Sequence, residues 1–422
     1  MTASDADFRA RLDALIGLTD PPRRAKDPVT EAAIRIWCDA VGDENPAYQD
    51  PQWAARSAWG GIVAPATSLN MWTLPGNRRS HRHAESLDRV NEVLAERGFT
   101  SVAAVQTEHT YVRPLRVGDH LEQFPSIGAV SPQKSTRLGL GHFVDLVSEY
   151  RTVEGEPVGR VVLRMLRWNP ATRTEAPATP GDRLDRPVRP AGATQTDLPP
   201  AGTTGTLIAH LQPGYAAAPL DERPYLVGTA ELADGTRLSA DVVDLRPDLV
   251  HDGMPVVVAH RRTRDGQVLP VLTAPRPERR TSTRTAAEVS TGQRLAPWPI
   301  PVTQLSIAAL ATATFDFNDV HLDRDAAHER GARDVYMNIL GSSALVNCYL
   351  TDWAGPEARV VDFRTRLAAQ NHPGDTLTLD GVVTGLQRAP EAAAGGTHVT
   401  VDVRGTNSLG DHVIASATLA LP

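Results

Sequence analysis

The residues in this sequence best suited to proton transfer are Asp316 and His321, five positions apart in the segment DFNDVH. An imidazole takes up and returns a proton near neutral pH, and a carboxylate beside it orients a water molecule and stabilises the imidazolium. Asn318 lies between them and is placed to bridge backbone groups in the turn that brings both side chains to one face. Such a pair found alone is more often a surface hydrogen bond than a catalytic pair, so its context decides the interpretation.

Addition of water to the β-carbon of an α,β-unsaturated thioester is one reaction that this pair can perform. The reaction needs a base that activates the water, a proton donor for the α-carbon, and hydrogen-bond donors that polarise the thioester carbonyl. Asp316 and His321 supply the first two. The apolar spacing of ILGSSALVNCYL, after Asn338, predicts a buried central helix whose first N–H groups lack intrahelical partners. We therefore interpret the backbone N–H of Asn338 as the oxyanion donor.

Other catalytic constellations are absent from the sequence. It contains no G-x-S-x-G elbow, no P-loop, no G-x-G-x-x-G after a strand, and no metal-ligand spacing of His and Cys. Its two cysteines, Cys38 and Cys348, are too few for a disulfide framework or a four-ligand zinc site, and this usage suits a reducing compartment. We expect no metal and no cofactor, and the sequence identifies no cofactor-binding residue.

The elements that position the pair occur twice. Residues 28–48 and 301–321 correspond at a constant offset of 273 positions, since PVT opens both segments and D-x-N follows in both. Between these motifs, EAAIRIWCDAVG and QLSIAALATATF carry apolar residues at helical spacing, with Thr30 and Thr303 placed as N-caps. Each half is thus predicted to begin with a short amphipathic helix that leads into an Asp-x-Asn turn.

The repeat continues into strands. Val117-Gly118-Asp119 and Pro373-Gly374-Asp375 are predicted tight turns before strands, and both halves end in long alternating segments. One helix covered by long antiparallel strands is an α+β arrangement. A duplicated scaffold without an active site would explain the repeat as well, but the motif in the second copy favours one working site.

A different composition separates the two copies. Residues 171–200 are rich in Pro, Ala and Thr and are predicted to be a linker. Residues 201–280 contain short alternating strands with hairpin signals at Asp234-Gly235 and Asp265-Gly266, which predicts a small all-β barrel. The basic run at 275–284, PRPERRTSTR, is typical of a solvated linker.

Bulk composition sets limits on partners and location. A chain of 422 residues is expected to form two to three domains. Its formal charge of -7 gives no attraction for nucleic acid or anionic membranes, so we expect neither as a partner. The N-terminus lacks the apolar core of a signal peptide, and no run of about 18 apolar residues occurs. We expect a cytoplasmic protein.

The motif DFNDVH resembles the signature D-x-N-P-[hydrophobic]-H of the MaoC-like (R)-specific enoyl-CoA hydratases, which have the hotdog fold. Asp316, Asn318, Val320 and His321 match it, whereas Asp319 stands where proline is usual. In this family the oxyanion amide follows a histidine, and here the corresponding pair is Met337-Asn338, so only the backbone role carries over. The resemblance implies a catalytic hotdog domain at residues 281–422.

The first half resembles the same family, with DENPAY in place of the signature. Asp43, Asn45 and Pro46 are kept, but Tyr48 stands where the catalytic histidine would be. A phenol with a pKa near 10 is no base at neutral pH, so a hotdog domain at residues 1–170 is expected to be catalytically silent. Its implied role is to complete a double hotdog and to line the acyl pocket. The insert between Trp72 and Thr100 is longer than its C-terminal counterpart and hints at a pocket for a bulky acyl group.

The middle segment, 201–280, resembles the OB-fold domain associated with acyl-CoA enzymes, without the usual zinc ribbon because no Cys lies there. The combination resembles the two-subunit enoyl-CoA hydratases of actinobacterial steroid side-chain degradation, here fused into one chain. The predicted fold class is therefore α+β, two hotdog domains with an inserted all-β OB-fold domain. The resemblance implies a steroid-CoA substrate, with CoA as part of the substrate, and a thiolase-like aldolase that docks on the OB-fold domain.

Two alternatives stay open. One is a MaoC-like hydratase or dehydratase that acts on another acyl-CoA or a polyketide intermediate, which requires the same residues. The other is a noncatalytic acyl-CoA-binding scaffold for a thiolase-like partner, in which case Asp316→Ala and His321→Ala leave partner binding and function unchanged. The sequence also allows either a monomer, because two hotdogs in one chain complete a double-hotdog unit, or a homodimer.

Overall fold

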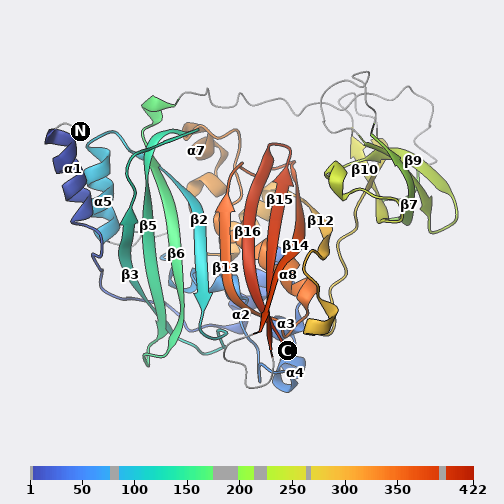
Figure 1. Ribbon diagram of the computed structural model, residues 1–422, viewed down its shortest axis with the longest axis horizontal. Helices are drawn as coiled ribbons and strands as arrows, with labels where there is room; N and C mark the ends of the chain where they lie inside the picture. Colours follow the sequence, from blue (N-terminus) through green and yellow to red (C-terminus); the bar gives the residue numbers. More distant parts are fainter. Residues whose placement is uncertain (1–2, 77–84, 174–197, 213–225, 263–267, 389–395) are drawn as a thin grey trace.

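In the computed structural model, one large sheet covers the central helices, and a small barrel stands beside one end of that sheet (Figure 1). The structure describes residues 3–76, 85–173, 198–212, 226–262, 268–388 and 396–422. Most of the predicted linker at 171–200 and the hairpin signal at Asp265-Gly266 lie outside the described residues, as does part of the insert between Trp72 and Thr100.

The N-terminal half contributes five helices, three 3-10 turns and six strands to the described part of the chain. Its helical elements are α1 (Ala3–Asp13), α2 (Glu31–Val41), α3 (Pro46–Gln49), α4 (Pro51–Arg56), η1 (Ala66–Ser68), η2 (Met71–Thr73), α5 (Glu85–Ala95) and η4 (Pro170–Thr172). Its strands are β1 (Arg23–Arg24), β2 (Ser101–Tyr111), β3 (Leu121–Val130), β4 (Lys134–Thr136), β5 (Gly139–Thr152) and β6 (Pro157–Trp168).

The C-terminal half is more compact in sequence. Its helical elements are η6 (Ala286–Glu288), α6 (Gln304–Ala313), η7 (Asp319–His321), α7 (Arg324–Glu329) and α8 (Ile339–Ala354). Its strands are β12 (Arg294–Pro301), β13 (Arg359–Leu367), β14 (Thr376–Arg388), β15 (Thr397–Asn407) and β16 (Gly410–Leu421). β12 carries three prolines and lies at the edge of the sheet, where a missing N–H breaks no ladder.

Both halves share one eleven-stranded sheet, in the order β1-β3-β5-β6-β2-β13-β16-β15-β14-β12 with β4 paired to β5. The halves meet at the antiparallel pair β2 and β13, where His109 lies opposite Phe363. Outward from this seam the strands follow equivalent orders, β2-β6-β5-β3 on one side and β13-β16-β15-β14 on the other. The sequence repeat therefore produces two sheet halves related by an approximate two-fold axis.

The first helix of each half begins as the sequence predicts. Thr30 accepts a hydrogen bond from the N–H of Ala33 at the start of α2, and Thr303 accepts one from Ser306 at the start of α6. Each threonine thus satisfies one of the N–H groups that a helix leaves unpaired at its first turn. The two helices pack against one another behind the sheet.

α8 is the central helix predicted after Asn338. Every one of its residues except Trp353 is buried, because the helix lies between the sheet and the helices of both halves. A mainly apolar helix without an exposed polar face is stable only in such a position. Asn338 is its N-cap and accepts the N–H of Gly341.

The N-terminal half has no helix of this length at the corresponding place. Positions 66–73, which the offset of 273 relates to 339–346, form only the short turns η1 and η2. The segment ATSLNMWT contains residues that compete for backbone hydrogen bonds, and Pro75-Gly76 ends it. The insert that follows carries α5, which packs with α1 in a separate apolar cluster against β3 and β5.

The middle segment forms a closed barrel of β7 (Thr204–Leu211), β8 (Leu226–Leu232), β9 (Arg237–Val242), β10 (Pro255–Arg262) and β11 (Val268–Thr273), with the turn η5 (Pro247–Leu249). The Asp234-Gly235 turn joins β8 to β9, as predicted. Arg246 ties the barrel to the large sheet, since its guanidinium lies 3.0 Å from Asp380 of β14.

The basic run at 275–284 is not the solvated linker that its composition suggests. Arg276 donates to the carboxylate of Asp352 at 2.9 Å, the backbone N–H of Arg280 donates to the Asp352 carbonyl, and Arg284 donates to the carbonyl of Trp353. The last carbonyls of a helix have no intrahelical donors, so the arginines satisfy the C-terminal end of α8. Within the described residues, no helix is long and apolar enough to cross a membrane.

Candidate active site

The predicted acid/base pair comes together at the N-terminal end of α8. Asp316 follows α6, His321 ends η7, and Oδ2 of Asp316 lies 3.6 Å from Nε2 of His321. The amide of Asn338 lies against the same carboxylate, with Nδ2 3.0 Å from Oδ2 of Asp316. The structure thus brings three of the predicted site residues into one cluster.

The imidazole of His321 is held in one orientation. The side chain is 8% exposed, and Nδ1 lies 2.7 Å from the carbonyl oxygen of Tyr336. A carbonyl only accepts hydrogen bonds, so Nδ1 carries the hydrogen and, in the neutral ring, Nε2 has the free lone pair. The ring of Tyr336 packs edge-on against the imidazole at 5.2 Å. The atom able to take a proton therefore faces Asp316.

Asp316 sits on an uncommon backbone turn. Phe315, just before it, has a φ of 55°, which places a non-glycine residue in the left-handed region. The backbone N–H of Asp316 then returns to the carbonyl of Ala311 at 2.9 Å. Backbone strain of this kind is concentrated at functional sites, where surrounding contacts over-determine the conformation.

The side chain of Asn318 does not bridge backbone groups, contrary to the sequence prediction. Its Oδ1 accepts from Arg330 at 3.3 Å, and Arg330 also pairs with Asp319, the residue that replaces the usual proline. The turn is closed by the Asn318 backbone carbonyl, which accepts the N–H of His321 at 3.1 Å. Asn318 therefore supports the turn through its main chain. The ion pair between Arg330 and Asp319 restrains the backbone at the position where the family usually has a proline.

The backbone N–H of Asn338 makes no hydrogen bond within the described part of the chain. The preceding N–H, of Met337, is bound to the carbonyl of Asn371. Asn338 stands at the positive end of a sixteen-residue helix. A free N–H at this position is the donor that an oxyanion requires.

The first half repeats this geometry with different side chains. We call Asp43, Tyr48 and Pro65 the silent site, because the sequence predicts that this half is inactive. By the offset of 273 they correspond to Asp316, His321 and Asn338. The backbone matches closely: Gly42 has a φ of 73° where Phe315 has 55°, and the N–H of Asp43 returns to the carbonyl of Cys38 at 2.9 Å. Asn45, which the motif of the first half shares with that of the second, caps α3 through its side chain. Burial raises the pKa of Tyr48 further above its ordinary value.

The silent site lacks counterparts of two of the three groups that are predicted to act in the second half. A tyrosine hydroxyl with a raised pKa holds its proton, so it is no base. Pro65 is the N-cap of η1 and has no N–H to donate to an oxyanion. A pocket at the silent site is lined by Tyr48 and by apolar side chains of both halves, among them Leu69, Val158 and Val360.

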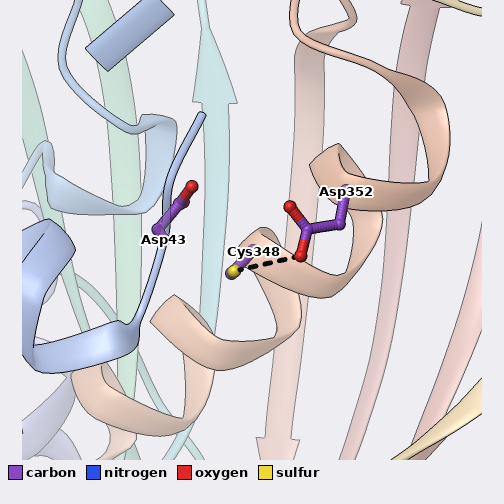
Figure 2. A group of neighbouring side chains, drawn as sticks. All are labelled: Asp43, Cys348 and Asp352. Atoms are coloured by element: carbon purple, nitrogen blue, oxygen red, sulfur yellow. Dashed lines mark hydrogen bonds between the residues drawn. The ribbon is translucent and has the colours of Figure 1, made fainter. Parts of the chain in front are cut away.

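Asp43 also belongs to a buried cluster with Cys348 and Asp352 of α8 (Figure 2). One possible ligand atom from each residue lies within 4.8 Å of the others, a spacing that could hold a metal ion. However, Arg276 already donates to Asp352 at 2.9 Å and lies 3.5 Å from the Cys348 sulfur. The guanidinium supplies positive charge here, so charge balance does not require a cation.

Burial raises the pKa of Asp43 to about 7. Between pH 4 and 7 the folded chain therefore holds a proton that the unfolded chain has released, so the free energy of unfolding falls as pH rises through this range and levels off above it. We expect Asp43→Asn, which cannot ionise, to match the wild type near pH 4 and to exceed its stability at pH 8 by on the order of a few kcal/mol. Urea unfolding midpoints at both pH values measure this.

The comparison between variant and wild type at each pH removes the contribution of all other titrating groups. A stability difference of the same size at pH 4 and pH 8 would show that Asp43 does not titrate in the folded chain as its burial implies.

Known proteins give two informative matches. A family model described as FAS1-like, dehydratase domain region, matches residues 15–161. A protein of Thermomonospora curvata named as a probable enoyl-CoA hydratase alpha subunit is 30% identical over 313 residues, which cover 64% of this chain and 97% of that protein. The chain belongs to the MaoC-like enoyl-CoA hydratases. As a member of this family it is an enzyme, a hydro-lyase.

Two further matches, one in sequence and one in fold, extend the likeness. The 3-oxo-4,17-pregnadiene-20-carboxyl-CoA hydratase beta subunit of Mycobacterium tuberculosis is 43% identical over 115 residues, 27% of this chain and 83% of that protein. A solved structure of a MaoC-like dehydratase has a TM-score of 0.58 and 18% identity, with 97% of this chain and 99% of that one covered. The shared fold confirms the predicted α+β class with a double hotdog.

Sequence reasoning missed two contributors to this MaoC-like site. The carbonyl of Tyr336 orients His321, and the hydroxyl of Thr314 lies 3.0 Å from the amide of Asn338. A backbone carbonyl leaves no signal in residue types. Thr314 lies two positions before the motif. The only sequence signal for it is that its counterpart in the first half, at the offset of 273, is Val41.

Proposed function

We propose that the C-terminal half hydrates an α,β-unsaturated acyl-CoA, with Asp316 and His321 as its acid/base pair. The observation that carries this proposal is the approach of Asp316 Oδ2 to His321 Nε2 at 3.6 Å, with the opposite imidazole nitrogen bound to a carbonyl. Two proton acceptors that face one point are suited to hold a water molecule by both of its hydrogens.

In this mechanism the held water attacks the β-carbon. Its oxygen forms the new C–O bond while His321 Nε2 takes one of its protons, and Asp316 stabilises the imidazolium. The electron pair of the C=C bond moves toward the thioester, and negative charge develops on the carbonyl oxygen. This oxygen accepts a hydrogen bond from the backbone N–H of Asn338. The imidazolium then gives its proton to the α-carbon, which returns His321 to the neutral state and completes the addition of one water.

The substrate that we propose is a steroid side-chain enoyl-CoA. The likeness to the beta subunit of a pregnadiene-carboxyl-CoA hydratase supports it, and so does the likeness to the alpha subunit of that hydratase, because this chain resembles both kinds of subunit at once. The short turns η1 and η2 stand where the other half has a sixteen-residue helix, so less of this half's interior is filled by its own chain. That difference favours a bulky acyl group over a short one.

Hydration of a steroid enoyl-CoA and of a short crotonyl-type thioester, followed by the loss of the conjugated thioester absorbance, tests the substrate. We expect a higher kcat/KM for the steroid thioester. Activity on the short thioester alone would keep the mechanism and reject the steroid. No activity on either by the folded protein would favour the noncatalytic scaffold.

We also infer that the barrel is an OB-fold that docks a thiolase-like aldolase, which cleaves the hydrated product. Five strands in a closed barrel, with β9 and β11 as its parallel pair, support the fold. Two large apolar side chains of β7, Ile208 and Leu211, are 38% and 65% exposed. Exposed apolar residues on one strand are suited to a protein contact.

Co-elution of the full chain with a thiolase-like aldolase in size-exclusion chromatography tests this docking. Leu211→Asp is expected to abolish the complex and to leave hydration intact, whereas Leu409→Asp, at an exposed leucine in the turn between β15 and β16, is expected to leave the complex intact. A complex that survives Leu211→Asp would place the aldolase elsewhere.

A further inference from the structure

The amide of Asn338 can lie in only one orientation. Its Oδ1 accepts the N–H of Gly341 at 2.9 Å, as the N-cap of α8. Nδ2 therefore points the other way, and its two hydrogens go to Thr314 Oγ1 and Asp316 Oδ2, both at 3.0 Å. Asn338 is 3% exposed, and a flipped amide would turn Nδ2 toward the N–H of Gly341 and Oδ1 toward the carboxylate of Asp316, so the hydrogen bonds exclude it.

Thr314 fixes the other side of this amide. Its hydroxyl, which is buried, donates to the carbonyl of Leu310 at 2.7 Å. With its hydrogen used in this way, Oγ1 offers a lone pair to Nδ2 of Asn338. The chain of bonds from Leu310 through Thr314 and Asn338 ends on Asp316 and leaves none of these polar side chains unpaired. A fully satisfied buried network of this kind is rigid.

The silent site shows the same carboxylate without this network. At the offset of 273, Val41 replaces Thr314 and Pro65 replaces Asn338, so neither the acceptor nor the donor exists. Asp43 keeps one backbone donor, the N–H of Asn45, but its Oδ2 is buried with no hydrogen-bond partner. The half that lost the catalytic histidine has thus lost both members of the network as well.

We propose that Thr314 and Asn338 act as a pair of positioning residues that hold the carboxylate of Asp316 at its working distance from His321. This inference rests on the proposed function and adds side-chain roles that the backbone N–H of Asn338 does not cover. Loss of either side chain leaves Asp316, which is 27% exposed, free to rotate toward solvent. Because substrate contacts are unaffected, the loss appears in kcat rather than in KM.

Three variants separate positioning from folding. Thr314→Val keeps the shape and removes the hydroxyl, and Thr314→Ser restores it. Asn338→Asp keeps an oxygen to cap α8, which Asp does as well as Asn, but replaces the donor by a second carboxylate against Asp316. We expect kcat to fall about tenfold in Thr314→Val and about a hundredfold in Asn338→Asp, with KM within about twofold, and Thr314→Ser to recover most of the loss.

Thr351→Val is the matched control. Thr351 is buried on α8 and donates to a carbonyl four residues earlier, as Thr314 does, but in the described structure it makes no hydrogen bond to Asp316, His321 or Asn338. We expect its kcat to equal that of the wild type.

The experiment compares kcat and KM of the three variants at Thr314 and Asn338 and of the Thr351→Val control on one enoyl-CoA, with the wild type in parallel. Wild-type kcat in both Thr314→Val and Asn338→Asp would overturn this inference and leave the proposed function standing. Equal losses in Thr314→Val and Thr351→Val would also overturn it, because the effect would then be a general cost of burying valine. An inactive wild type would overturn the proposed function and this inference together.

Discussion

Replacement of His321 by alanine is expected to lower kcat for hydration by about 10²–10⁴, with little change in KM. The imidazole is the only group near Asp316, within the described part of the chain, that is able to accept a proton at neutral pH and return it. Tyr336, the neighbouring phenol, has a pKa raised by burial and stays protonated. Steady-state kinetics on an enoyl-CoA, with folding checked by circular dichroism, measure the loss.

His372→Ala is the control for this prediction. His372 is also buried, its Nδ1 also bonds a backbone carbonyl, that of Val335 at 3.0 Å, and its ring also meets Tyr336. No carboxylate is bonded to its Nε2 in the described structure. A loss of kcat in His372→Ala as large as in His321→Ala would mean that packing around Tyr336, and not proton transfer, explains the first result.

Asp316→Asn is expected to lower kcat by a similar factor, about 10²–10⁴. The amide has nearly the shape of the carboxylate but carries no charge to stabilise the imidazolium. It also replaces one of the two acceptor oxygens by an NH2 donor, so only one oxygen is left to accept the hydrogen bond that Nδ2 of Asn338 gives to Asp316 at 3.0 Å. Steady-state kinetics on the same enoyl-CoA measure this loss of kcat.

The chain contains its own control for this variant. Asp43 occupies the corresponding position of the silent site, and Asp43→Asn makes the identical chemical change there. We expect Asp43→Asn to retain wild-type kcat. A loss of activity in Asp43→Asn equal to that in Asp316→Asn would show that the first half takes part in catalysis, contrary to the reading of Tyr48 and Pro65.

The sequence was sufficient for features that depend on local patterns. The N-cap threonines, the helix after Asn338 and the pairing of Asp316 with His321 follow from apolar spacing, from capping chemistry and from a short motif in one turn. The approximate two-fold arrangement of the sheet follows from the repeat at an offset of 273, because two copies of one sequence pattern fold alike.

Features that depend on tertiary contacts could not be predicted in this way. Asn318 was expected to bridge backbone groups, but Arg330, twelve residues away, takes its oxygen. The arginines of 275–284 were expected in solvent, but they donate hydrogen bonds to the carboxylate of Asp352 and to backbone carbonyls at the C-terminal end of α8. In both cases the outcome depends on a partner that only the folded chain brings near.

The same limit applies to Thr314. Its role depends on the direction of one amide group, and that direction is fixed by the N–H of Gly341 on the far side of Asn338. Comparison of the two halves offers the only signal in the sequence, since Val41 and Pro65 differ where the working site has Thr314 and Asn338.

α8 connects the two sites of the molecule. Its N-terminal end carries Asn338 at the working site, and Cys348 and Asp352, about three turns later, face Asp43 at the silent site (Figure 2). The helix is therefore shared by both halves, which explains why nearly all of it is buried while the other half has only η1 and η2 at the corresponding place.

The most direct test of the account is the mass of the product that the chain forms from an α,β-unsaturated acyl-CoA. We predict a product heavier than the substrate by one water, with the hydroxyl on the β-carbon, from the wild type and from Asp43→Asn, and none from the double variant Asp316→Asn, His321→Ala. Unchanged substrate with the folded wild type, or hydration at the wild-type rate by the double variant, would contradict the claim that Asp316 and His321 form the working site.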